Sequence, residues 1–395
     1  MVDQPDIAPA SQGRSSWDAR FDALDGWRGL CALMVVALHA PISGPIGQSG
    51  FVRHGFLFVD FFFVLSGFVI AHAWARRLAG EKRWQPFLIA RFWRVYPLHL
   101  AMLLAFVLFE ALRRGSHMGS AETPDSFFHN LLLTHSLGFV EQLGWNYPSW
   151  SISAEFVSYV VFAALMVWSP RRLGPILAAI ALCGITILLA RLGHIEAHVD
   201  YGWLRCLAGF CVGALLRLRF WDMLRFHPRA GTRGLWTLVE IGAVAYVVAF
   251  VTLFGASPVS VAAPLVFAAA IFVFAHESGA VSRILKTRPI AVLGLLSYSI
   301  YMTHAFVIAR LTNAGTLAER LLGWHVFVGP QAEARLMADS LGRELLVLGL
   351  ITVGTLVLSV LTWRFVEQPG QALGRSLARG ERRLGFDLLR GVRRA

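Results

Sequence analysis

Long apolar runs, separated by short polar segments, recur along the whole chain. Period-2 alternation is weak, which argues against a membrane barrel, and an open sheet cannot cross lipid because its edge amides would stay unpaired. Helices remain, and a helix needs about 20 mostly apolar residues to cross the hydrocarbon core. Ten runs fit this description: 27–42, 56–74, 96–112, 150–168, 173–190, 203–218, 235–254, 259–275, 290–309 and 344–365. A weaker run, 127–140, is short for a span and predicts a re-entrant or interfacial segment.

Basic residues gather in every second polar segment, and this asymmetry sets the predicted orientation. With the N-terminus inside, most of the 36 Lys and Arg residues fall in inner segments, as the positive-inside rule requires. An even number of spans keeps both ends of the chain on one side. The predicted fold class is therefore all-α: a polytopic integral membrane protein with about ten transmembrane helices and both termini cytoplasmic.

Three regions follow along the chain. Residues 1–23 are polar and lack the apolar core of a signal peptide, so we expect a disordered cytoplasmic lead. Residues 24–369 are expected to form the membrane domain, and residues 370–395 a basic cytoplasmic tail. Segment 384–392 of this tail has the amphipathic pattern of a helix that lies on anionic lipid.

Composition agrees with a membrane protein. Hydrophobic residues make up 56% of the chain and charged residues only 15%, against about 25% charged in soluble domains. The net charge of +12 follows from the basic inner segments, so we expect no nucleic-acid partner. Four cysteines lie in apolar runs without a CxxC pair, and we expect small buried residues, neither disulfides nor metal ligands: Cys31, Cys183, Cys206 and Cys211. No close metal-ligand spacing of His residues occurs, and we expect no metal.

Polar groups inside predicted spans are costly and mark candidate functional residues. Arg28 and His39 are eleven positions apart in the first span, so about three helical turns bring both onto one face, about 16 Å apart. A neutral imidazole can take a proton from a hydroxyl group and later release it. Asp60, near the outer end of the second span, is expected to approach His39 and orient its ring, as in catalytic triads. The structural alternatives are a snorkelling arginine, a satisfied histidine and an interfacial aspartate.

Arg91 and Arg94 precede Pro97, and their spacing of three places both guanidinium groups on one helix face at the inner surface. Two such planar groups suit phosphate oxygens. The alternative is that both residues only anchor the helix end on the inner side of the membrane.

Two further spans carry polar stripes. Ser151, Glu155 and Tyr159 recur at every fourth position, and Ser153 lies between them. Ser297, Tyr301 and His304 follow the spacing i, i+4, i+7 on another span. Either stripe could be a structural hydrogen-bond cluster, but a carboxyl group inside an apolar helix needs a partner or a proton. The last polar group, 364–369, is expected to combine a helix-stopping proline, Pro369, with charged interfacial anchors.

Taken in order, these groups resemble the acyltransferase 3 family of membrane O-acyltransferases. The matching elements are R-x10-H (Arg28, His39), VDFFFVLSGF (with Asp60), RxxR before a proline (Arg91, Arg94), W-S-x-S-x-E (Trp150 to Glu155), YSIYMTH (Tyr298 to His304) and F-x-E-x-P (Phe365 to Pro369). Each element alone is weak, but six in order, from about Leu24 to Pro369, are fairly specific.

The resemblance implies an enzyme of the bacterial inner membrane. It implies an acyl-CoA donor, usually acetyl-CoA, as co-substrate without a permanently bound cofactor, and a glycan or glycosylated acceptor. Three groups of site residues follow: His39, Asp60 and Glu155 as catalytic residues, Arg28, Arg91 and Arg94 for the donor, and Ser151, Ser153, Tyr301 and His304 for the acceptor or the oxyanion. Direct transfer and a transient acyl-histidine both fit the sequence. The rival hypothesis is a transporter or flippase, although the paired repeats of many carriers are not found.

Overall fold

The structure is a computed structural model that describes residues 20–81, 83–112, 121–225, 230–328 and 337–380. In these ranges the chain is helical, without a β-strand, and has one isolated bridge between Ile42 and Ala338. The helices are α1 (Asp22–His39), α2 (Gly50–Arg53), α3 (Phe58–Glu81), α4 (Trp84–Leu112), α5 (Pro124–Leu131), α6 (Trp150–Trp168), α7 (Leu173–Leu192), α8 (Gly202–Leu215), α9 (Asp222–Leu224), α10 (Arg233–Phe254), α11 (Ala263–Phe274), α12 (Ala280–Leu285), α13 (Arg288–Leu322), α14 (Leu341–Thr362) and α15 (Gln368–Ala378).

Each of the ten predicted spans falls on a helix, and the all-α membrane fold is confirmed. Within the described ranges seven helical segments are long and apolar enough to cross a membrane: Gly55–Gly80, Trp84–Leu112, Tyr147–Trp168, Pro170–Leu192, Arg233–Phe254, Arg288–Leu322 and Leu341–Ala378. The other three predicted spans lie on α1, α8 and α11, which are shorter or carry charges in their first turn. The predicted sidedness of the termini stays a prediction.

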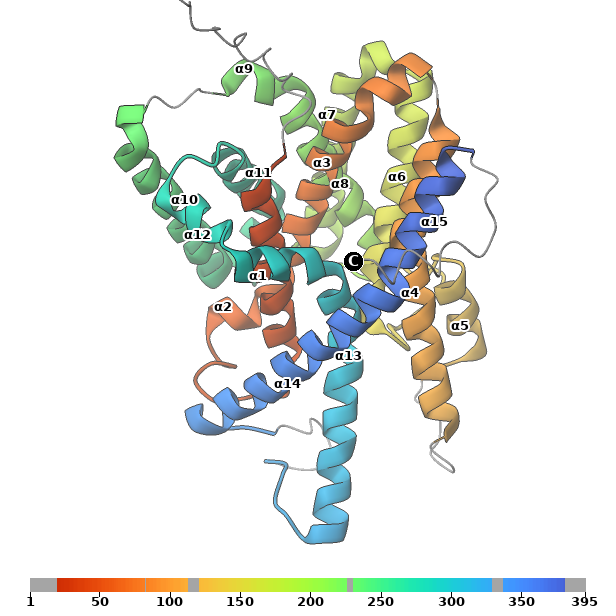
Figure 1. Cartoon of the computed structure of the whole chain (residues 1–395), viewed down its shortest axis with the longest axis vertical. Helices are drawn as coiled ribbons and strands as arrows, with labels where there is room; N and C mark the ends of the chain where they lie inside the picture. The colour runs from red at the N-terminus through yellow and green to blue at the C-terminus, as the bar shows by residue number, and fades with distance from the viewer. Residues whose placement is uncertain (1–19, 82, 113–120, 226–229, 329–336, 381–395) are drawn as a thin grey trace, which may run out of the picture.

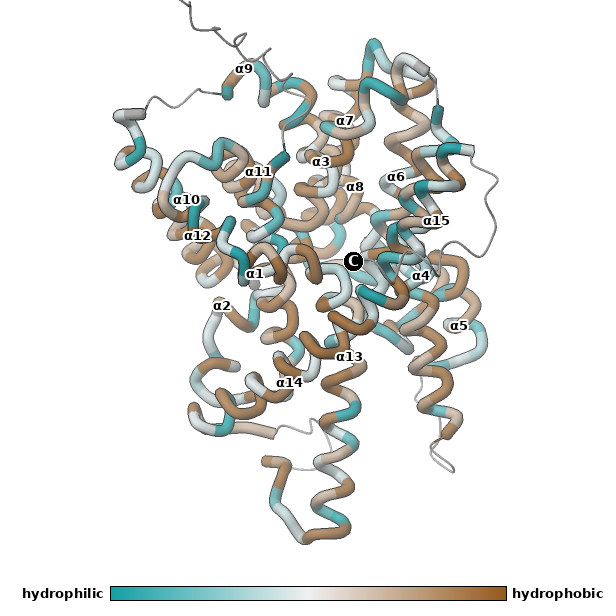
Figure 2. The backbone as a smooth tube through the Cα atoms, in the orientation of Figure 1, coloured by the Kyte–Doolittle hydropathy of each residue, from teal (hydrophilic) through white to brown (hydrophobic). Residues whose placement is uncertain are grey.

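The bundle has a central group of helices flanked on two sides. Figure 1 shows α1, α3 and α8 in the middle, α10 to α12 on one side, and α4, α5 and α15 on the other. Figure 2 shows hydrophobic residues along most of the long helices, with hydrophilic residues at the upper end of the bundle and around α15. The weak run 127–140 is not a span, since α5 ends at Leu131 and no helix follows until Tyr147.

Two details of the prediction are corrected. Pro369 does not stop the last helix, because a π-helical turn (Trp363–Glu367) joins α14 to α15 and places the proline in the first turn of α15, where its missing N–H is tolerated. The predicted boundary at 369/370 therefore falls within a helix that packs on α4. Cys183 is exposed on α7 although the other three cysteines are buried, and all four are free thiols. The predicted lead up to residue 19 and the segment 384–392 lie outside the described residues.

Helices α3 and α8 approach each other so closely that their backbones touch. A Cβ atom on Gly213 would overlap the carbonyl group of Val64, and one on Gly67 would overlap the carbonyl group of Phe210. Small residues permit this approach between helices that cross a membrane, where packing replaces hydrophobic driving force. Gly67 and Gly213 have this role in the structure.

A fully buried ion pair lies in the same interface, near the beginnings of both helices. Arg205 of α8 donates from Nε to Oδ1 of Asp60 at 3.0 Å and from Nη2 to Oδ2 at 2.7 Å, and both side chains are 0% exposed. Two further N–H groups donate to the carbonyl oxygens of Phe56 and Ala197, and its guanidinium carbon lies 5.5 Å from the ring of Trp150. The pair therefore ties α3 to α8, to the segment before α8 and to α6.

We predict that Gly213→Ala destabilises the bundle. The new methyl group meets a backbone carbonyl group that cannot move aside without separating α3 and α8, and such overpacking costs about 1–3 kcal/mol. The matched control is Gly242→Ala on α10, where a Cβ atom meets nothing within 4 Å. Thermal unfolding of the purified protein in detergent should show a lower midpoint for Gly213→Ala alone. Equal midpoints for the two variants would contradict the close approach of α3 and α8.

We predict that Asp60→Leu and Arg205→Leu each destabilise the protein strongly, whereas the double variant recovers much of the loss. Breaking a buried ion pair leaves one uncompensated charge and costs about 3–5 kcal/mol, while replacing both partners with apolar residues is often neutral. The yield of monodisperse protein and its unfolding midpoint measure the effect. Losses that simply add in the double variant would mean that the two side chains do not stabilise the fold through each other.

Candidate active site

A polar cavity of about 170 Å³ opens among α1, α3, α4, α6 and α13. Its apolar wall comes mainly from α3, and its polar wall consists of Arg28, Ser66, Arg91, Arg94, Ser151, Glu155, Tyr159, Ser297, Tyr298 and Tyr301. Eight of the ten belong to the polar groups singled out in the sequence, and Ser66 and Tyr298 join them. Residues up to 273 positions apart thus meet in one space.

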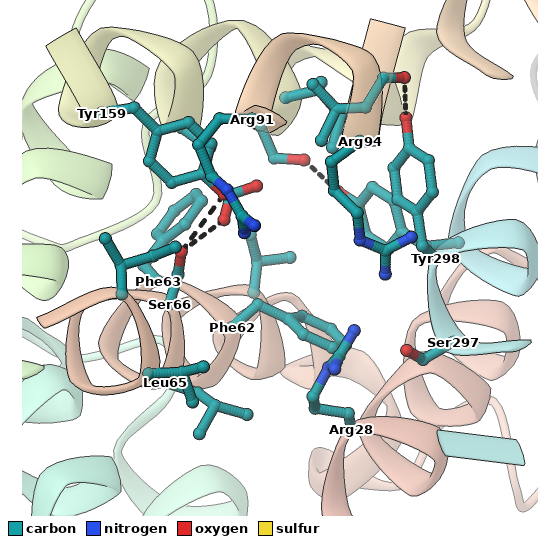
Figure 3. A pocket seen from close by; sticks show the side chains of 18 residues that line it. Arg28, Phe62, Phe63, Leu65, Ser66, Arg91, Arg94, Tyr159, Ser297 and Tyr298 are labelled. Carbon is teal, nitrogen blue, oxygen red and sulfur yellow. Dashed lines mark hydrogen bonds between the residues drawn. The ribbon is translucent and has the colours of Figure 1, made fainter. Parts of the chain in front are cut away.

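Three arginines from two helices surround the mouth of this cavity. Figure 3 shows Arg28 of α1 and Arg94 of α4 pointing toward one another, with Arg91 of α4 farther to the left, beside Tyr159. Arg28 is paired with Asp25 at 3.0 Å. The Nε atom of Arg91 is buried and has no hydrogen-bond partner among the described residues. The spacing of Arg91 and Arg94 therefore places both on the cavity, as predicted, and not only at the helix end.

Arg94 is held in place by Glu367, which the sequence did not identify as a site residue. Glu367 is 2% exposed and accepts from Arg94 and, at 2.7 Å, from the hydroxyl group of Ser299. The prediction of a merely interfacial anchor is wrong here, because the π-helical turn lies beside α4 and α13 and its glutamate is buried there. No local sequence signal shows that its partner lies 273 positions away.

Glu155 lies deeper on the same wall. It accepts a hydrogen bond of 2.6 Å from Ser66, whose hydroxyl group is also 3.4 Å from that of Tyr159. Ser151, Glu155 and Tyr159 all line the cavity, which confirms the predicted stripe along α6. The contact between Ser66 and Glu155 is a feature that the sequence did not reveal.

The deep end of the cavity is closed by two hydroxyl groups. Ser151 donates to the phenol oxygen of Tyr301 at 2.9 Å, and this phenol donates to the carbonyl oxygen of Pro148 at 3.0 Å. Ser151 also lies 3.1 Å from the same carbonyl oxygen. The hydroxyl group of Ser151 or of Tyr301 can therefore rotate its proton from Pro148 toward a ligand oxygen in the cavity, while the other hydroxyl group keeps a hydrogen bond.

A pair of histidines lies beyond this end. His304 has its Nδ1 atom 2.6 Å from the carbonyl oxygen of Tyr301, so Nδ1 must carry the proton and Nε2 the lone pair. That lone pair is 3.2 Å from Nδ1 of His39, which is also 2.9 Å from the carbonyl oxygen of Val35. Both neighbours of His39 Nδ1 are acceptors, so this nitrogen carries a proton. The hydrogen-bond network assigns the lone pair of neutral His39 to Nε2.

His39 does not line the cavity. Its ring lies 5.0 Å from that of Tyr147 and 5.1 Å from that of His304. Tyr301, whose ring is 5.9 Å from His304, belongs to the cavity wall. One layer of side chains therefore separates the imidazole of His39 from the space beside the three arginines.

The predicted contact between Asp60 and His39 is corrected. Both oxygens of Asp60 accept from Arg205, while the hydrogen bonds of the His39 ring run to Val35 and His304. His304 thus has the position beside the ring that the sequence assigned to Asp60. Arg205 lies in an apolar helix without any motif, which is why the sequence did not indicate it as the partner of the carboxylate.

Ser153 is also placed elsewhere. Its hydroxyl group donates to the carbonyl oxygen of Leu133 at 2.6 Å and accepts from Ser136 at 2.9 Å. It therefore anchors the segment after α5, and the expectation that it faces the acceptor is not met. Among the residues that the structure describes, no group of His, Cys, Asp and Glu is arranged to hold a metal ion.

Comparison with known proteins identifies the family. Residues 21–364 match the acyltransferase domain family known as acyltransferase 3. A Bacillus subtilis protein, YrhL, provisionally named a peptidoglycan O-acetyltransferase, is 24% identical over 90% of this chain and 56% of its own length. The peptidoglycan O-acetyltransferase OatA of Listeria monocytogenes is 25% identical over 73% of this chain and 50% of its own length.

A shorter relative, protein 2 in the picA locus of Rhizobium radiobacter, is 34% identical over 38% of this chain and 84% of its own length. The chain thus spans about half the length of the two peptidoglycan O-acetyltransferases. No solved structure matches. With the family match over nearly the whole membrane domain, the chain belongs to the acyltransferase 3 family of membrane acyltransferases.

Proposed function

We propose that this acyltransferase moves an acyl group, acetyl in the first place, from acyl-CoA on the cytoplasmic side to a hydroxyl group of a glycan or glycosylated acceptor. One observation carries the proposal. Three arginines surround the mouth of a polar cavity whose deep end, at Ser151 and Tyr301, adjoins the histidine pair His39 and His304. Because the chain belongs to an acyltransferase family, the rival hypothesis of a transporter or flippase is not needed. No feature of the described cavity favours that hypothesis.

The arginines would hold the phosphate groups of the donor. Guanidinium groups bind phosphate oxygens through two parallel N–H donors. Arg94 is kept in position by Glu367, and the buried Nε of Arg91 has an unused donor. A donor bound here would direct its pantetheine arm along α3 toward Ser151 and Tyr301.

The chemistry would then centre on His39. Its Nε2 lone pair takes the proton of the acceptor hydroxyl group as the oxygen attacks the thioester carbonyl, so that a C–O bond forms and the C–S bond breaks. The proton passes from His39 to the departing thiolate. A proton from Ser151 or Tyr301 would stabilise the developing oxyanion. Both acceptors at Nδ1 stabilise the imidazolium that exists between these proton transfers.

Access to His39 requires a movement. The ring of Tyr301 stands between the cavity and the histidines and contacts Phe62 edge to face at 6.0 Å. The proposal needs Tyr301 to turn aside when the donor arm is in place, which would join the cavity to His39. In the structure as it stands the donor cavity and the proposed base are separate.

We predict that His39→Ala abolishes acyl transfer. Loss of a general base costs about 10²–10⁴-fold in rate. The measurement is the ester-linked acetyl content of surface glycans in a deletion strain that carries the variant, compared at equal membrane abundance. The control is His325→Ala, which changes an exposed histidine away from the cavity. Wild-type acetylation by the His39 variant would remove this residue from the mechanism.

We predict that His304→Leu lowers kcat by about 10- to 100-fold while the KM for the donor stays the same. A hydrogen bond to a charged group contributes about 1.5–3 kcal/mol, and here it would act on His39 and not on the bound nucleotide. His304→Gln should recover much of the activity, since an amide can donate to the Tyr301 carbonyl oxygen and accept from His39.

Steady-state kinetics of both His304 variants in nanodiscs provide this comparison. If both lose activity only in proportion to a fall in their unfolding midpoints, His304 has a structural role and does not position the base.

A further inference from the structure

A second, wider recess of about 810 Å³ lies between the end of α3, the beginning of α4 and helix α15. Its cationic lining includes Arg77, Arg91 and Arg375, and among the residues that the structure describes no acidic one lines it. Like charges repel, so an assembly of this kind is expected where an anion fills the space between them.

The last helix is fixed against α4 by close packing. A Cβ atom on Gly370 would lie 2.6 Å from the ring of Pro97, and one on Gly374 would overlap the side chain of Trp93. Only glycine permits this approach. This packing places Arg375, which follows Gly374, beside α4, the helix that carries Arg91 and Arg94.

The recess and the polar cavity adjoin each other. Arg91 and Arg94 line both spaces. The buried Nε atom of Arg91, which has no hydrogen-bond partner among the described residues, lies at this junction. A ligand that places its phosphate groups in the recess can therefore extend a thin arm past these two arginines into the cavity.

A competing recess of about 420 Å³ flanks Arg94 on its other side, next to the beginning of α1. Its acidic residues are already paired with its basic ones: Asp22 lies 2.7 Å from Arg20 and Asp25 lies 3.0 Å from Arg28. Its other two basic residues, Arg94 and Lys286, are paired with Glu367 and Glu277, so this recess is close to neutral. Charge therefore favours the recess beside α15 for a ligand with several negative charges.

We propose that the recess beside α15 binds the phosphate ester at the nucleotide end of the donor, with Arg77 and Arg375 as specificity residues. The inference rests on the proposed function. A phosphomonoester carries about −1.5 to −2 charges at neutral pH, which suits the 3′-phosphate of CoA. The phosphate of an anionic lipid headgroup has the same chemistry, but only the nucleotide carries an arm that enters the cavity.

The test compares acetyl-CoA with acetyl-dephospho-CoA, which lacks the 3′-phosphate, in nanodiscs of zwitterionic lipid. The wild type should have a KM at least about tenfold lower for acetyl-CoA. The variant Arg77→Gln with Arg375→Gln should lose this discrimination through a raised KM for acetyl-CoA, at unchanged kcat. The control variant, Arg171→Gln with Arg172→Gln, removes two exposed charges between α6 and α7, outside the recess, and should keep the discrimination.

Direct binding of CoA and dephospho-CoA, measured by calorimetry, separates this inference from the proposed function. Preferential binding of CoA that depends on Arg77 and Arg375, without any acyl transfer, would support the recess and refute the enzymatic proposal. Discrimination that survives in the recess variant overturns the inference. The inference is also overturned if the Arg77 and Arg375 variant differs from the wild type only in its response to added phosphatidylglycerol, since that result would assign the recess to lipid.

Discussion

A charge inside a membrane bundle must be paired or must face a polar space, and this constraint organises the whole structure. The buried ion pair of Asp60 and Arg205 meets it through both carboxylate oxygens and four N–H groups of the arginine, which bond within α3, α8 and their neighbours. The arginines around the cavity meet it only in part. Arg94 has Glu367, but Arg91 keeps a buried donor without a partner. The same physical rule thus separates a charge that holds the fold together from charges that face the cavity.

The sequence predicted the features that depend on local patterns of apolar and polar residues. Apolar length located all ten helical runs, and helical spacing placed Ser151, Glu155 and Tyr159 on one wall of the cavity. The sequence could not predict partners chosen by the tertiary fold. Asp60 was assigned to a histidine because histidine is its usual partner at such sites, but a lone arginine 145 positions away is the nearer one. Glu367 was interpreted as an interfacial anchor. Its burial depends on a π-helical turn beside α4 and α13, and no sequence motif indicates this turn.

In the proposed mechanism the histidine pair determines which nitrogen of His39 accepts a proton. A base that could expose either nitrogen would spend part of its time in the wrong tautomer. The carbonyl oxygen of Tyr301 fixes the proton on His304, which in turn leaves His39 only one nitrogen that can accept. In the proposed mechanism this arrangement replaces the carboxylate of a catalytic triad without placing another charge in the membrane.

The separation between cavity and base also has a chemical reason. A thioester beside an activated base and water would be hydrolysed, and exclusion of water protects such intermediates. With Tyr301 in its present place, a donor arm in the cavity meets two hydroxyl groups but not the imidazole. Under the proposed mechanism the ring would move only when the arm displaces it. The donor itself would then open the path to His39, and acyl groups would be exposed to the base only while CoA occupies the arginines.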